Sequence, residues 1–118
     1  MRRLWRALPA LLLLFLLSLG AQAVKKAEDL FYAENFSYVG DFAGVISGER
    51  EDYFALRSQA LERATGAQIV VVTVPSLEEY TVEEYANELF NSWGIGKKGD
   101  DSGMLILLST GERKIRVE

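Results

Sequence analysis

Apolar and polar residues recur with the period of a strand or a helix along most of the chain after residue 36. Residues 68–74 (QIVVVTV) are almost continuously apolar, which predicts a strand covered on both faces, and residues 104–108 (MLILL) predict a second buried strand. Between them, an apolar face at spacings of three and four residues predicts an amphipathic helix: it consists of Val82, Tyr85, Ala86, Leu89, Phe90 and Trp93. This order predicts a right-handed crossover between parallel strands.

Capping signals place both predicted helices. Thr81 and Glu84 form a capping box at the start of the helix just described, with Tyr80 stapled onto Tyr85, and Gly94 ends it. A second helix is predicted between Ser47, a capping residue, and Gly66, a left-handed C-terminal residue. Its apolar face is expected to consist of Tyr53, Leu56, Ala60 and Ala64, widened by Phe54 and Leu61.

The remaining segments are less regular. Residues 24–36 show no period and are expected to be an exposed lead-in. Residues 36–46 carry aromatic and aliphatic anchors broken by Gly40 and Gly44, which predicts an irregular segment pinned to the core. Residues 114–118 (KIRVE) alternate charged and apolar, as an antiparallel strand with one solvated face should. We therefore expect an α/β domain with a mixed three-stranded sheet that is incomplete at its C-terminus, because the chain stops inside its last strand.

Residues 1–23 have the features of a secretory signal peptide. A basic start (1–6) and a leucine-rich apolar run (7–20) precede Ala21–Ala23, which has the small-x-small pattern of a signal peptidase site. The run is short for the ~30 Å hydrocarbon core of a membrane. We therefore expect cleavage and a periplasmic or extracellular protein, with a retained membrane tether as the alternative.

Composition excludes several kinds of chemistry. The 118 residues contain no cysteine and no histidine, which excludes a thiol nucleophile, a Ser-His-Asp triad and a Cys/His zinc site. A metal would need oxygen ligands, which points to calcium or magnesium. Removing residues 1–23 leaves 10 basic and 17 acidic side chains, a net charge of −7, so nucleic acid is not an expected partner.

Three segments together resemble the TPM domain family, named for a thylakoid lumen protein, a photosystem II repair protein and a nematode receptor modulator. They are YVGDFAGVIS at 38–47, TGAQIVVVTV at 65–74, and the stretch 84–118, which contains WGIG at 93–96 and DSG at 101–103. The resemblance covers nearly all of the chain after the signal peptide. It implies an α/β/α sandwich with a mixed sheet in residues 37–118, truncated because further helices usually follow the last strand in the family.

Members of this family are described in different roles. Some are described as acid phosphatases, and divalent cations have been associated with the fold. Others act in the maintenance of protein complexes or as accessory modulators. Many bacterial members are exported and carry a C-terminal membrane helix. The resemblance therefore implies an exported protein with an envelope protein partner, and membrane association of a full-length parent through such a helix.

The candidate site residues are Asp41, Asp100, Asp101 and Arg113. Asp41 is either a metal ligand or nucleophile, or a cap for a neighbouring backbone amide. Asp100 and Asp101 lie between Gly99 and Gly103 and are either cation ligands or turn formers; by the family pattern, Asp101 is the matching position. Arg113 could clamp a phosphate with its planar fork or be a solvated surface group.

Two functions are compatible with these residues. The first is a non-catalytic accessory module for the assembly, maintenance or regulation of envelope proteins, with any cation serving structure. The alternative is an extracytoplasmic phosphatase in which Asp41 and Asp101 hold calcium or magnesium and Arg113 orients the phosphate. We favour the accessory module, because the chain lacks histidine and shows few ligands.

Overall fold

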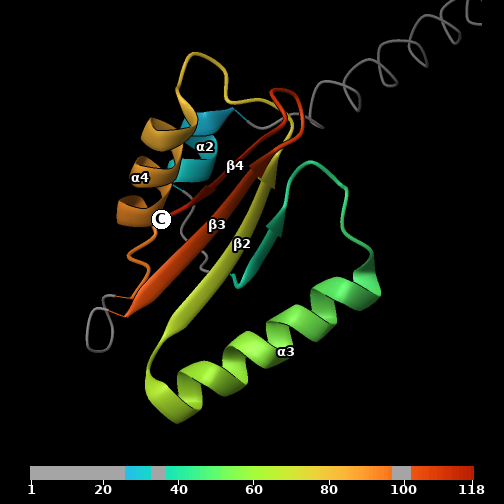
Figure 1. Ribbon diagram of the computed structural model, residues 1–118, viewed down its shortest axis with the longest axis vertical. Coiled ribbons are helices and arrows are strands. Elements are labelled where there is room, and N and C mark those ends of the chain that lie inside the picture. The colour runs from blue at the N-terminus through green and yellow to red at the C-terminus, as the bar shows by residue number, and fades with distance from the viewer. Residues whose placement is uncertain (1–25, 33–36, 97–101) are drawn as a thin grey trace, which may run out of the picture.

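The computed structural model describes residues 26–32, 37–96 and 102–118, which form a mixed four-stranded sheet with helices on both faces (Figure 1). The helices are α2 (Ala27–Phe31), α3 (Gly48–Thr65) and α4 (Val82–Ser92). The strands are β1 (Val39–Asp41), β2 (Gln68–Val74), β3 (Gly103–Ser109) and β4 (Lys114–Val117). The predicted signal peptide lies outside the described residues. Within them, no helix is both long and apolar enough to cross a membrane.

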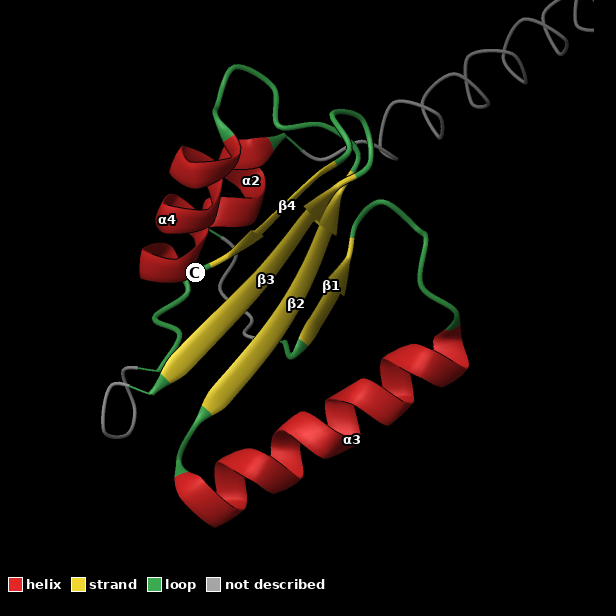
Figure 2. Ribbon diagram, viewed as in Figure 1, coloured by secondary structure: helices red, strands yellow, loops and turns green. Residues whose placement is uncertain are grey.

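The sheet has the order β1-β2-β3-β4, in which the first three strands are parallel and β4 pairs antiparallel with β3 (Figure 2). The crossover from β2 through α4 to β3 confirms the predicted strand-helix-strand unit. The segment expected to be irregular instead contains a short edge strand, β1, so the sheet has four strands where three were predicted. The register of β1 with β2 places Val39 beside Val71 and Asp41 beside Thr73.

One face of the sheet carries the hydrophobic core. Alternate residues of β2 and β3, among them Val70, Val72, Leu105 and Leu107, are fully buried on the side that α4 covers. Burial of each such side chain stabilises the folded state by about 1.5–3 kcal/mol relative to an exposed side chain. The face predicted for α4 is confirmed: Val82, Tyr85, Ala86 and Leu89 are buried, and Phe90 and Trp93 pack against them. Thr81 caps α4 by accepting a hydrogen bond from the Glu84 N–H at 3.1 Å.

Residues 27–31 correct the expectation that the segment 24–36 is exposed. They form α2, which lies beside α4 and buries Ala27, Leu30 and Phe31 in the core. The Phe31 ring packs edge-on against Tyr85 with ring centroids 4.9 Å apart, and the Trp93 indole N–H donates to the Leu30 carbonyl at 2.7 Å. Five helical residues are too few to show a period in the sequence, which is why this element was missed.

Among the described residues, the opposite face of the sheet is covered by α3, which contacts β1 and β2. Ser47 and Gly66 cap α3 as predicted, Gly66 with φ +80°. The predicted apolar face is wrong, however: Tyr53 and Leu56 are 62% and 67% exposed, and the buried residue of α3 is Ser58. Apolar residues occur on several sides of this helix, so spacing did not decide which side meets the sheet. The prediction that residues 104–108 form a buried strand is confirmed at Leu105 and Leu107 but wrong at Met104, which is 42% exposed.

Candidate functional site

The carboxyl ends of β1, β2 and β3 meet at one edge of the sheet, which we call the carboxyl edge. Open α/β sheets bind their ligands just outside this edge. Here it carries two acidic side chains, Asp41 at the end of β1 and Glu112 in the turn between β3 and β4. The polar residue Thr73 of β2 lies beside Asp41, and Ser109 ends β3. These residues form the candidate site within the described part of the chain.

The Asp41 carboxylate is bound by donors from its own chain. Its Oδ1 accepts hydrogen bonds from the Thr73 hydroxyl at 2.5 Å and the Val45 N–H at 3.0 Å, and its Oδ2 accepts from the Ile46 N–H at 2.9 Å. The Thr73 hydroxyl also accepts from the Ala43 N–H at 3.1 Å. Asp41 therefore closes the turn between β1 and α3 and ties that turn to β2.

The same contacts set the charge of Asp41. Desolvation by partial burial raises the pKa of the carboxyl group, but the hydrogen bonds from Thr73 and the N–H groups of Ile46, Val45 and Gly44 outweigh it. The pKa of Asp41 is consequently lowered from its ordinary value, and the group is ionised at neutral pH. Calcium takes six to eight oxygen ligands. The neighbours of Asp41 are mainly N–H donors, so they suit a backbone cap better than a cation.

Glu112 makes a second cap of the same kind, and sequence reasoning missed it. Its carboxylate accepts from the Ser109 hydroxyl, from the Leu77 N–H at 3.1 Å to Oε2, and from the Ser76 hydroxyl at 3.5 Å. The hydrogen bond from Ser109, followed by those from the Leu77 N–H and Ser76, lowers the pKa of Glu112 against the opposing effect of desolvation. The sequence did contain one indication of this cap: Glu112 lies in a tight turn, three residues after Ser109. Glu112 joins the β3–β4 turn to the segment after β2.

Arg113 lies at the carboxyl edge next to Glu112. It has a positive φ of 55° and an exposed side chain in the β3–β4 turn. Strands β2 and β3 lie between this turn and β1, which ends with Asp41. The structure therefore places Arg113 and Asp41 at one edge, on opposite sides of the sheet's two central strands. No hydrogen bond or ion pair links them.

Asp100 and Asp101 lie outside the described residues, between Gly96 and Ser102. Gly103, which follows Ser102, pairs with Gln68 at the start of β2, whereas Asp41 pairs with Thr73 near its end. These positions are separated by about 16 Å along β2 at ~3.3 Å per residue. The described residues include no group of three or more acidic side chains arranged to hold a metal ion. A joint site of Asp41 and Asp101 therefore stays a prediction.

A polar network marks the opposite, amino edge of the sheet. The Gln68 amide accepts from the Gly96 N–H at 2.7 Å and donates to Glu62 of α3 at 2.8 Å, and Glu62 also accepts from the Tyr38 hydroxyl. The hydrogen bond to Glu62, then desolvation, raises the pKa of Tyr38. Gly96 and Gly103 touch so closely that a Cβ on Gly96 would lie 2.7 Å from the Gly103 nitrogen. The network therefore fixes both ends of the segment that contains Asp100 and Asp101 relative to α3.

Comparison with known proteins identifies the fold and the family. The family model described as the TPM domain matches residues 39–118. The chain is similar to the solution NMR structure of the N-terminal domain of a P. gingivalis protein, with 30% identity and a TM-score of 0.66 over 80% of this chain and 62% of that one. The N-terminal domain of the cg2496 protein from Corynebacterium glutamicum has the same fold, with 19% identity and a TM-score of 0.58 over 73% and 57%. The chain thus spans less than two thirds of either solved domain. A search of curated proteins found no match.

Proposed function

Since this chain belongs to the TPM domain family, we propose that it is a non-catalytic accessory module that assists the assembly, maintenance or regulation of envelope proteins. The observation that carries the proposal is the state of the two acids at the carboxyl edge. Asp41 and Glu112 each accept hydrogen bonds from a side-chain hydroxyl and from backbone N–H groups of their own chain. Carboxylates used in this way stabilise turns, and a nucleophile or metal ligand would have to give up such bonds.

The phosphatase is the alternative, and one observation favours it. Asp41 is ionised at the carboxyl end of a parallel strand, where α/β enzymes place reacting groups. The word phosphatase also stands in the name of the matching family model. In this alternative Asp41 and Asp101 would hold calcium or magnesium, Arg113 would orient the phosphate, and the metal would supply Lewis-acid activation.

The two functions are separated by an assay on a chromogenic phosphate ester. The purified chain is tested with calcium, with magnesium and with EDTA, beside the variants Asp41→Ala, Asp101→Ala and Arg113→Gln. Asp52→Asn is the matched control, because Asp52 is an exposed acid of α3 outside the carboxyl edge. We expect no cation-dependent turnover above a blank. Turnover that disappears in Asp41→Ala and Asp101→Ala but persists in Asp52→Asn would contradict the accessory function.

The accessory function includes export. We propose that residues 1–23 direct the chain out of the cytoplasm and that its partner is a protein of the envelope. The basic start, the apolar run and the Ala21–Ala23 pattern support this. A fusion of residues 1–30 to a reporter enzyme that is active only outside the cytoplasm tests the proposal in a bacterial host. An inactive fusion that accumulates in the cytoplasm would contradict it.

A further inference from the structure

Helix α2 begins shortly after the predicted signal peptidase site. The small-x-small pattern ends at Ala23, and Ala27 is the first residue of α2. An extended chain spans at most ~3.6 Å per residue, so the Cα atoms of Ala23 and Ala27 lie no more than about 14 Å apart. Lys26, which precedes α2, is extended and exposed. Once α2 has docked, the folded domain therefore lies within this short reach of the Ala23–Val24 bond that the peptidase would cut.

The side chains of α2 are held inside the hydrophobic core. Leu30 and Phe31 are both 2% exposed, and the Phe31 ring packs edge-on against Tyr80 and Tyr85 with ring centroids 5.5 and 4.9 Å apart. Figure 1 shows α2 beside α4. Tyr85 belongs to α4 and Tyr80 lies just before it, so α2 can dock only after the α4 region has folded.

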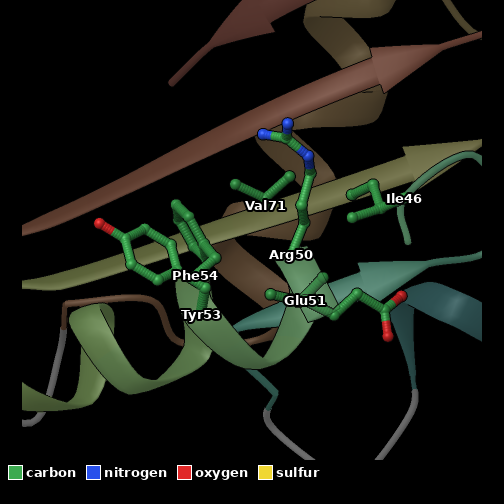
Figure 3. Close-up of a pocket in the computed structure, with 7 residues that line it drawn as sticks. Ile46, Arg50, Glu51, Tyr53, Phe54 and Val71 are labelled. Carbon is green, nitrogen blue, oxygen red and sulfur yellow. The ribbon is translucent and has the colours of Figure 1, made fainter. Parts of the chain in front are cut away.

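Two hydrogen bonds fix the backbone of α2 to other parts of the chain. The Glu78 carboxylate accepts from the Ala27 N–H, and the Trp93 indole N–H donates to the Leu30 carbonyl at 2.7 Å. Helix α3, by comparison, leaves a pocket of about 230 Å³ against the sheet, lined in part by Val71 (Figure 3). Helix α2 is thus docked through both apolar and polar contacts, and opening it breaks all of them together.

Docking of α2 and cleavage of the signal peptide make opposite demands on the same short stretch of chain. A peptidase encloses the residues on both sides of the bond that it cuts, so proteolysis occurs where the backbone is exposed and not tied down. In a folded protein, a bond beside a docked segment is cut through the fraction of molecules in which that segment has opened. Cleavage of a folded precursor is therefore expected to be limited by the opening of α2.

We propose that docking of α2 and removal of the signal peptide exclude each other. The Ala23–Val24 bond is cut while α2 is undocked, and a chain whose α2 docks first keeps its signal peptide as a membrane tether. Cleavage consumes one water molecule and leaves a carboxylate on Ala23 and an ammonium group on Val24. The order of the two events thus decides between a released and a tethered protein. The inference rests on the proposed export and goes beyond it by naming the element that controls processing.

The test compares the cleavage of folded and loosened precursors. The full chain of residues 1–118 is purified in detergent micelles, its fold is verified by circular dichroism, and it is incubated with purified bacterial signal peptidase. Phe31→Ser, which removes a ring that is 2% exposed, should raise the cleavage rate about tenfold or more. Tyr32→Ser is the matched control: it removes the next aromatic ring, which is 73% exposed, and should change the rate less than about twofold. Equal rates for the wild type and Phe31→Ser would overturn the proposal.

A second variant leaves α2 intact and moves the bond instead. An insertion of about eight Gly and Ser residues between Lys25 and Lys26 separates the bond from the domain by roughly 15 Å more. Urea unfolding should give the midpoint of the wild type, while the cleavage rate should rise about tenfold or more, because opening of α2 is no longer needed. An insertion precursor that is cut as slowly as the wild type would overturn the proposal, even where Phe31→Ser fails to fold.

Export itself is measured separately. The reporter fusion of residues 1–30 lacks the α4 region, so its α2 segment has no partner to dock on. The fusion should be exported, and the peptidase should cut it as fast as it cuts Phe31→Ser. A fusion that stays in the cytoplasm would contradict export and this inference with it. An exported fusion together with a folded wild-type precursor that is cut equally fast would contradict the role of α2 and leave export standing.

Discussion

Replacing Asp41 by alanine is expected to lower the free energy of unfolding by about 2–3 kcal/mol. Hydrogen bonds to a charged group contribute ~1.5–3 kcal/mol each when they are buried, and removal of a helix cap costs ~0.5–2 kcal/mol. Val45 is 55% exposed, so water can replace one of the lost bonds. Thr73 is 1% exposed, so its hydroxyl loses an acceptor that water does not readily replace. The expected loss in the free energy of unfolding therefore lies well below the sum for three fully buried bonds.

The pH dependence of stability tests the same contribution of the Asp41 carboxylate. The folded pKa of Asp41 lies below its ordinary value, so its ionised form is more favourable in the folded than in the unfolded chain. The stabilisation is complete above the unfolded pKa of ~3.9 and is lost as the pH falls through the folded pKa. The difference in stability between the wild type and Asp41→Asn should therefore be full near pH 6 and shrink below about pH 4.

Urea unfolding monitored by circular dichroism measures both effects. A loss of 2 kcal/mol corresponds to a fall in Tm of about 8–16 °C for a domain of this size. Asp52→Asn is the control, since no hydrogen bond from the Asp52 side chain connects it to the described residues. Equal stability of Asp41→Asn and Asp52→Asn would refute the role of Asp41 as a cap of the turn between β1 and α3. A difference that appears only with calcium or magnesium would make Asp41 a metal ligand instead.

Three further changes test other contacts. Glu112→Gln should lower the urea midpoint of unfolding at neutral pH and lower it less at pH 3, because the amide group puts donors where the carboxylate accepts. Gly96→Ala should cost at least ~3 kcal/mol in the same measurement, since its Cβ would meet Gly103 at 2.7 Å and φ is +80°; an unchanged unfolding midpoint would contradict the close approach. Trp93→Phe should lower Tm by about 4–8 °C through loss of the hydrogen bond to Leu30, and faster protease cleavage at α2 than in the wild type should accompany it.

The sequence predicts the central part of the fold well because local and tertiary preferences agree there. The bounds of β2 are as predicted, and α4 buries the face that its spacing indicates. The stretch 27–31 is too short for a period to be visible, and its burial depends on contacts with Tyr85 and Trp93 far along the chain. For α3, apolar residues on several sides leave the choice of the buried face to the sheet, which selects the side of Ser58.

The candidate site could be predicted only in part. Asp41 was named from the sequence, and the structure shows it accepting hydrogen bonds from Val45, Ile46 and Thr73, as a backbone cap would. Its role as a metal ligand or nucleophile stays a prediction. The bond from Thr73 depends on strand pairing between residues 32 positions apart, which no local pattern reveals. Glu112 was missed for the same reason, because its donors follow β2 whereas Glu112 follows β3.

The position of α3 depends on polar contacts at both ends of the sheet. This helix buries only Ser58 completely, so apolar packing alone holds it weakly against the sheet. At its start the turn is tied to β2 by Asp41, and near its end Glu62 bonds Gln68. These two attachments place α3 over β1 and β2. The ionised state of Asp41 therefore has a structural explanation: its carboxylate ties the turn at the start of α3 to Thr73 of β2, and the position of α3 depends on that contact.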